Sequence, residues 1–121
     1  MKKLETNAII ESIEKGKYPL SINAEKQNRH ILGVSEYKAG KSYLNISVEE
    51  AQSIVDENYQ NAEYQFDRNF KWKHTALIRC TKIIGCNISN KTNKITETNK
   101  VKVHFSKTGT HIVPRLSLIH I

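Results

Sequence analysis

The spacing of apolar residues in the first half of the chain predicts two amphipathic helices. The first spans residues 4–15, where one helical face would carry Leu4, Ala8, Ile9, Ile10 and Ile13, and Gly16 is placed to end it. The second spans residues 47–58 and opens with Ser47 and Glu50, the pair of a capping box. Its inner face would carry Val48, Ala51, Ile54 and Val55. Residues 17–33, which contain Pro19 and Gly33, are expected to be irregular.

The apolar pattern changes to a period of two after residue 60, which is typical of strands. Residues 62–66, 76–81, 83–88 and 95–105 are β-branched or aromatic runs, and residues 110–113 form a last strand. Turns are expected at residues 89–94 and 107–109. The order predicts an α+β fold, with N-terminal helices packed on one face of a twisted antiparallel β-sheet of about four to five strands. Residues 1–115 would form a single domain, followed by an apolar tail, residues 116–121, to which we assign no function.

Composition adds a charge asymmetry to this picture. The chain has 121 residues, 38% of them apolar and 26% charged, as in an ordinary soluble domain. Its formal net charge is +7, and residues 61–121 alone sum to +8, against −1 for residues 1–60. A positive half-domain favours a phosphate-rich partner such as a nucleic acid, although it is also compatible with a solvated surface.

The cysteines and the apolar runs exclude several classes of protein. Cys80 and Cys86 belong to no recognised zinc spacing, so we expect free thiols or at most one disulfide. Only Glu97 is acidic beyond Asp67, which disfavours a two-metal nuclease; no metal and no cofactor is expected. No apolar run approaches the roughly 20 residues of a membrane span, and we expect neither a signal peptide nor a membrane partner.

The stretch HFSKTGTHIVP, residues 104–114, concentrates the chemistry that the chain offers. In the strand before the turn, alternation points Val101, Val103 and Phe105 to one face, and Lys102, His104 and Ser106 to the other. The apolar set must face the helices. Across the turn Ile112 is the natural core residue, so His111 should share the open face with His104, near Ser106, Lys107 and Thr110.

Two histidines on one face match the needs of RNA cleavage by its own 2′-hydroxyl. That reaction requires a base for the hydroxyl proton, an acid for the leaving 5′-oxygen, and cations or donors for the extra charge on phosphorus. Histidine suits the first two roles because its pKa lies near neutrality. The alternative is that both histidines are inert surface residues. Similarly, Phe70 and Trp72 in FKWK could stack on bases, but we favour core positions for both, and a surface position for His74.

The segment KVHFSKTGTHIVP resembles the closing signature of the bacterial polymorphic toxin type 50 domain, which runs roughly as IHYSKxGTHIVP. Upstream, QNRHILG at residues 27–33 and KSYL at residues 41–44 also match, followed by KW at residues 71–72 and IIG at residues 83–85. The similarity covers about residues 16–115. The THIVP end is quite specific, whereas KSYL or IIG alone would be weak. The frequent tyrosine of IHYS is Phe105 here, for which alternation predicts an apolar core role.

This resemblance implies a toxin-type ribonuclease of the barnase, EndoU, colicin and RelE-like fold group. Such domains are typically metal-independent, are delivered between bacteria or found in phage head-associated proteins, and have a cognate immunity protein. The resemblance therefore implies action in the cytoplasm of a target bacterium, on RNA, with tRNA as the usual target by analogy. Carried over to this sequence, it marks His30, Lys41, Ser42, His104, Ser106, Thr110 and His111.

Together these observations predict a metal-independent endoribonuclease that leaves 2′,3′-cyclic phosphate ends. His30 and His111 would share the base and acid roles in either order, with His104 as a third catalytic group or an orienting neighbour. Lys41, Ser42, Ser106 and Thr110 would hold the phosphate, and the RNA backbone would follow Lys102, Lys107 and Arg115. The alternatives are a nucleic-acid-binding module without catalysis and a phage head-associated interaction module.

Overall fold

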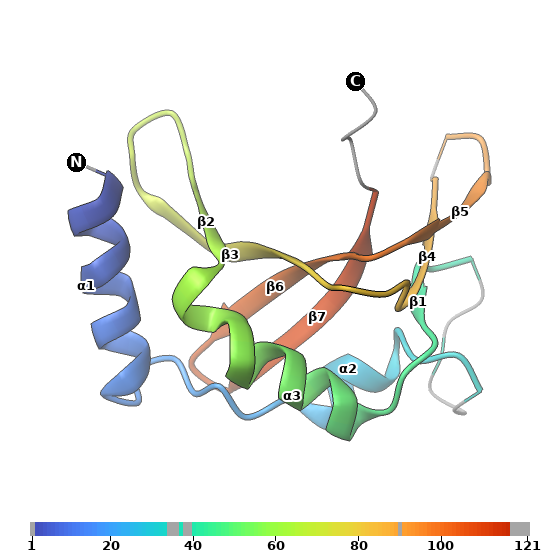
Figure 1. Cartoon of the computed structure of the whole chain (residues 1–121), viewed down its shortest axis with the longest axis horizontal. Helices are drawn as coiled ribbons and strands as arrows, with labels where there is room; N and C mark the ends of the chain where they lie inside the picture. Colours follow the sequence, from blue (N-terminus) through green and yellow to red (C-terminus); the bar gives the residue numbers. More distant parts are fainter. Residues whose placement is uncertain (1, 34–36, 38–39, 90, 117–121) are drawn as a thin grey trace.

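The computed structural model describes residues 2–33, 37, 40–89 and 91–116, which form three α-helices and two antiparallel sheets (Figure 1). This confirms the α+β class. The larger sheet has the order β2-β3-β6-β7, built from Glu63–Phe66, Trp72–Arg79, Lys100–Ser106 and Gly109–Arg115. The smaller one has the order β1-β4-β5, built from Tyr43–Leu44, Gly85–Ile88 and Ile95–Thr98. Ser117–Ile121 of the apolar tail lie outside the described residues.

Both predicted helices are present, and a third was missed. α1 spans Lys2–Glu14 and α3 spans Val48–Asn58, where Ser47 and Glu50 form the expected capping box. α3 crosses one face of the four-stranded sheet and buries Ala51 and Val55 fully (Figure 1). The missed helix, α2, spans only Ala24–Asn28, inside the stretch predicted to be irregular. Its sequence AEKQN has no apolar stripe, so periodicity gives no signal there.

Residues 95–105, predicted as one strand, belong to two different sheets. The chain changes sheet at Asn99, whose side chain donates to the Cys80 carbonyl while its own carbonyl accepts from Cys80 N–H. The Thr98 hydroxyl donates to the carbonyl of Arg115 at the end of β7. These polar contacts stop the ladder of β5 and begin that of β6. The prediction of one continuous strand was therefore wrong. The hydrogen bonds of Thr98 and Asn99 divide the segment into two strands, although its side-chain pattern is that of a single strand.

Within the smaller sheet, the backbones of β4 and β1 come unusually close at one position. Gly85 opens β4, and a Cβ atom there would overlap the carbonyl oxygen of Tyr43 in β1. Glycine is required because two backbones approach each other, which gives the IIG element a structural reason. The predicted strand at residues 83–88 is accordingly shorter, and β3 begins at Trp72, earlier than the predicted residue 76.

The inward face of the hairpin β6–β7 confirms the predicted alternation. Val101, Val103 and Ile112 are fully buried, and Phe105 is 5% exposed. The Phe105 ring lies 5.9 Å from that of Tyr64 and 5.4 Å from that of Trp72, so the position of the family's tyrosine is an apolar core position here. Trp72 packs against the core as predicted, but Phe70 is 69% exposed in a turn with φ of 62°, so its predicted core position was wrong.

Cys80 and Cys86 are free thiols, and His74 is exposed, as predicted. Within the described part of the chain, no helix is both long and apolar enough to cross a membrane.

Candidate active site: a stack of three histidines

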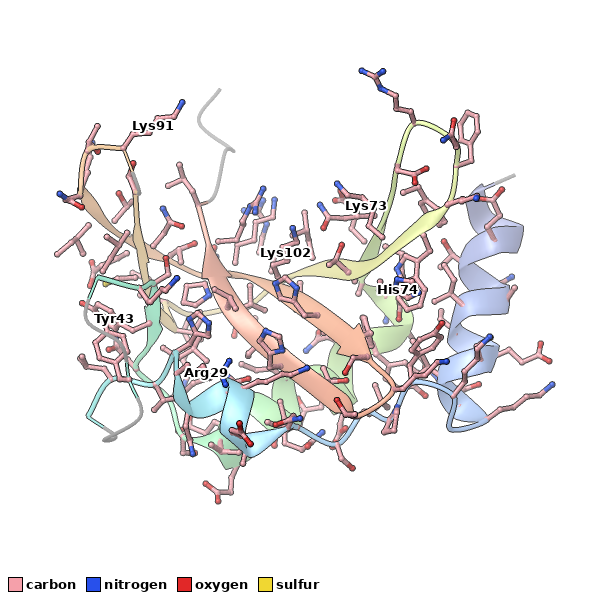
Figure 2. All side chains as sticks on the ribbon, turned by 180° about the vertical axis from the view of Figure 1, so that it is seen from behind. Arg29, Tyr43, Lys73, His74, Lys91 and Lys102 are labelled. Atoms are coloured by element: carbon pink, nitrogen blue, oxygen red, sulfur yellow. The ribbon has the colours of Figure 1, made fainter. Side chains whose placement is uncertain are left out.

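Three imidazoles meet on the open face of the four-stranded sheet, the face turned away from α3. His104 on β6 is the direct cross-strand partner of His111 on β7, and their rings stack 4.7 Å apart with planes 7° from parallel. His30 adds a third ring 6.2 Å from that of His111, with planes 9° from parallel. We call these three residues the histidine stack. Figure 2 shows the sheet from this side, with Lys102 over its middle and Arg29 on the helix beside β7.

His30 reaches the sheet because α2 is fastened to the outer edge of β7. Gln27 is fully buried; its side-chain Nε2 donates to the Ile112 carbonyl at 2.8 Å, and its Oε1 accepts from Ile112 N–H at 2.7 Å. Just before α2, Asn23 N–H donates to the Thr110 carbonyl, and Thr110 N–H donates to Ser21. The edge groups of β7 are thus satisfied by a segment more than eighty residues away in the sequence. His30 follows Gln27 by three residues, almost one helical turn, and therefore faces His111.

The orientation of the His30 ring is fixed from its other side. Its Nδ1 lies 3.0 Å from the carbonyl oxygen of Ser42. The backbone around it pairs with β1, since Leu44 N–H donates to the His30 carbonyl and Leu32 N–H to the Leu44 carbonyl. A carbonyl oxygen can only accept, so in the neutral ring Nδ1 carries the hydrogen and Nε2 carries the lone pair. His30 is therefore held in the tautomer that can take up a proton at Nε2.

All three imidazoles favour the neutral form. Burial lowers the pKa of His104 to about 4, and the nearby cations Lys102 and Arg115 act in the same direction. Burial also lowers the pKa of His111 to about 4, aided by the two neighbouring histidines and by Lys26 and Arg29. The pKa of His30 is lowered mainly by burial and then by Lys41 and Arg29, against the opposing effect of the Ser42 carbonyl. At neutral pH the free site thus holds three uncharged imidazoles with basic side chains around them.

The stack is not arranged to bind a metal ion. The lone pair of an imidazole nitrogen lies in the plane of the ring, so histidines that share a metal ion must be oriented with these lone pairs converging on the position of the metal. Rings that stack within 7° and 9° of parallel send their lone pairs in parallel directions instead. Among the described residues, no group of three or more His, Cys, Asp or Glu side chains is placed to hold a metal ion.

The family model for bacterial toxin 50 matches residues 22–114, a span that includes α2, both sheets and every member of the histidine stack. The chain belongs to the bacterial toxin 50 family. A search of curated proteins finds no match to it. The resemblance noted from the sequence is thereby confirmed, and the histidine stack lies within the part of the toxin domain that defines the family.

The basic residues of the toxin domain surround the stack from several elements. Lys102 lies on the same face as His104, two residues earlier in β6, and Arg115 ends β7 on the face of His111. Lys107 is exposed in the turn between the two strands, and Lys41 is exposed just before β1. The sequence did not single out Lys26 of α2 or Arg29, which caps α2, because the helix itself was missed. Their proximity to His111 could have been inferred only from the placement of α2 along β7.

The three hydroxyl residues chosen from the sequence have structural partners. The Ser42 hydroxyl accepts from Ile88 N–H, and the Ser106 hydroxyl donates to the Gly109 carbonyl within the turn. Thr110 is fully buried on the inward face, opposite Phe105, and its hydroxyl donates to the Pro19 carbonyl at 2.7 Å. The expectation that Thr110 lies near the two histidines on the open face, where it could hold the phosphate, was wrong. Thr110 lies two residues before Ile112, so the same alternation that exposes His111 turns Thr110 inward.

The site is an open surface. In the described part of the chain, hollows of about 380 and 360 Å³ lie beside α3 and the short 3₁₀ helix Tyr59–Asn61, and one of about 290 Å³ lies along β2; none of their lining residues belongs to the histidine stack. The rings are instead half-buried on the face of the sheet between α2 and β3. An open, cation-lined face suits an extended polymer better than a small molecule enclosed on all sides.

Proposed function

We propose that this toxin domain is a metal-independent endoribonuclease that cleaves RNA through the 2′-hydroxyl. The proposal rests on one observation: three separate segments of the chain bring three near-parallel imidazoles together on an open face bordered by cations. In the reaction a base removes the 2′-hydroxyl proton, the 2′-oxygen attacks phosphorus, and the bond from phosphorus to the 5′-oxygen breaks. An acid protonates the departing 5′-oxygen, which leaves a 2′,3′-cyclic phosphate and a 5′-hydroxyl.

The hydrogen bond to Ser42 favours His30 as the base. With Nδ1–H held by a carbonyl, the Nε2 lone pair of His30 is free to accept the 2′-hydroxyl proton, and the resulting charge is stabilised by that carbonyl. We assign the acid role to the His104–His111 pair as a unit, because two rings 4.7 Å apart titrate together.

The cations supply the remaining requirement, which is stabilisation of the extra negative charge on phosphorus. Lys102 and Arg115 border the stack on the sheet, and Lys26, Arg29 and Lys41 border it on the opposite side. Lys107 would extend the path of the RNA backbone. Action on RNA, with tRNA as one candidate, in the cytoplasm of a target bacterium, and neutralisation by an immunity protein, belong to the same proposal, through family membership.

A second candidate is favoured by the low pKa values of the free site. A stack that holds no proton at neutral pH has no loaded acid, which is the state expected of a module that grips RNA without cutting it. Cleavage separates the two candidates, because binding and its salt dependence would look alike for both.

The test is incubation of the purified protein with total bacterial RNA in EDTA, next to the His111→Asn and His74→Asn variants. His74 is a matched control: it is an exposed histidine that contacts Tyr18 and Trp72 instead of the stack, and its φ of 61° suits asparagine. The proposal predicts cleavage by the wild type and the His74 variant, and loss of cleavage in the His111 variant. Intact RNA with all three proteins, despite binding, would favour the second candidate.

A further inference from the structure

The charged groups around the histidine stack are one-sided. From α2 and its C-terminal cap come Lys26 and Arg29, from the loop before β1 comes Lys41, and from β6 and β7 come Lys102 and Arg115. Among the residues that the structure describes, every charged side chain that acts on the three rings is a cation or another histidine. The acidic residue of α2, Glu25, pairs with Arg29 at 3.5 Å, and its side chain is 85% exposed. Within the described ranges the stack therefore has no anionic partner of the kind that normally accompanies a charged imidazole.

This arrangement makes the proton content of the stack depend on what binds there. A proton added to the free stack would put a positive charge among two other rings and the five cations named above, in a half-buried position. An anion placed over the rings reverses that balance, because it attracts both the cations and the new proton. A single phosphodiester group carries the required negative charge.

We propose that the histidine stack is a proton-coupled phosphate site: one phosphodiester bound over the rings draws one proton from solvent onto the stack. The proton comes from water or buffer and goes to an imidazole nitrogen, so no bond in the ligand changes in this step. The neutral free state and the loaded acid required for cleavage are then two states of one site, and the substrate switches between them.

The inference rests on the proposed function for its choice of ligand, since the phosphodiester would be that of an RNA strand. It stands or falls separately, because it concerns binding alone. It also explains how the same three rings can be uncharged in the free toxin domain and still provide an acid during catalysis.

A ligand that cannot be cleaved and does not itself titrate tests this coupling. We would use a dinucleoside monophosphate with both 2′-hydroxyls methylated, at constant ionic strength, and follow the Cε1–H resonances of the histidines by NMR between pH 4 and 8, with and without the ligand. His74, outside the stack, serves as the internal reference. No variant is required, so misfolding cannot obscure the result.

The expected result is that the ligand moves the protonation of at least one stack histidine upward by one pH unit or more and leaves His74 unchanged. By linkage, affinity then increases as the pH falls, by up to about tenfold per pH unit for one proton, and levels off below the pKa of the free stack near 4. In the double variant His104→Asn/His111→Asn the pH dependence of affinity should largely disappear. Affinity that is constant from pH 8 to pH 4 would overturn the inference, and so would the absence of binding.

These outcomes are distinguishable from failure of the proposed function. Proton-coupled binding without cleavage of RNA would leave the inference standing and favour the binding module. Cleavage of RNA with binding that takes up no proton would support the nuclease and reject the coupling.

Discussion

Replacing Gln27 by methionine tests whether the fastening of α2 to β7 holds the site together. Gln27 is fully buried and forms two hydrogen bonds with one residue, accepting from Ile112 N–H at 2.7 Å and donating to the Ile112 carbonyl at 2.8 Å. Methionine keeps the length and volume of the side chain but forms neither bond. Both backbone groups of Ile112 on this edge would then be buried without a partner.

The size of the effect follows from that count. A buried polar group left unpaired costs about 1–3 kcal/mol, so the two groups together should lower the free energy of unfolding by about 2–6 kcal/mol. For a domain of this size that corresponds to a fall in Tm of roughly 10 °C or more. Equilibrium unfolding in urea can be followed by the fluorescence of Trp72, the single tryptophan, which packs against the core.

Gln52 provides a matched control. It makes the same kind of paired contact, with Oε1 accepting from Ile22 N–H and Nε2 donating to the Leu20 carbonyl, but it is only partly buried. Water can replace its hydrogen bonds, so Gln52→Met should cost less, about 1 kcal/mol. Equal stability of the Gln27→Met variant and the wild type, within about 0.5 kcal/mol, would refute the view that Gln27 fastens α2. If the contact between Gln27 and β7 positions His30, the pKa of His111 measured by NMR in the folded state of the Gln27→Met variant should also differ from that of the wild type.

Three further predictions concern charge and packing. As the pH falls from about 6.5 to about 4, the folded state should lose stability, because the pKa values of His104 and His111 are lowered only in the folded state and the unfolded chain therefore binds their protons first. The urea midpoint of the wild type should fall more steeply over this pH range than the midpoint of the double variant His104→Asn/His111→Asn. Parallel curves for the two proteins would contradict the burial of the stack. Lys102→Met should reduce the slope of log affinity for RNA against log salt by about 1, measured by titration at several salt concentrations, whereas an unchanged slope would remove Lys102 from the RNA path. Phe105→Tyr, which introduces the residue frequent in the family, should lower the free energy of unfolding by about 1–3 kcal/mol, because the new hydroxyl would enter the core beside Tyr64. The substitution should not raise the rate of RNA cleavage. A higher rate in a cleavage assay would show that residue 105 reaches the site.

The sequence predicted the sheet half of the site well because strand alternation is a local rule. A period of two in residues 101–106 puts His104 on the face of the strand that is turned away from the core residues Val103 and Phe105. The buried Ile112 likewise places its neighbour His111 on the outer face. The rule failed for Thr110 only where it was not applied consistently, since Thr110 and Ile112 share a face. The same local rules predicted α1 and α3 from their apolar stripes and from the Ser47 capping box.

The helical half of the site could not be reached by local rules. α2 is five residues long, and the one residue it buries is the polar Gln27, whose partner lies eighty-five residues away. Nothing in AEKQN shows that its amide will pair with the edge of β7, so no pattern places His30 beside His111. The resemblance to the toxin family singled out His30, but only the fold gives the ring distance and the Ser42 contact. The division at Asn99 was missed for a similar reason, because its partner Cys80 is distant in the sequence.

The most direct test of the central claim, that the histidine stack cleaves RNA through its 2′-hydroxyl, is to identify the ends of the products. A single-stranded RNA would be incubated with the protein in EDTA beside the same strand with every 2′-hydroxyl methylated, and the His30→Asn variant would be run in parallel. We predict fragments with 2′,3′-cyclic phosphate and 5′-hydroxyl ends from the unmodified strand alone, and none with the His30 variant. Cleavage of the methylated strand, or fragments that carry 5′-phosphates, would contradict the mechanism.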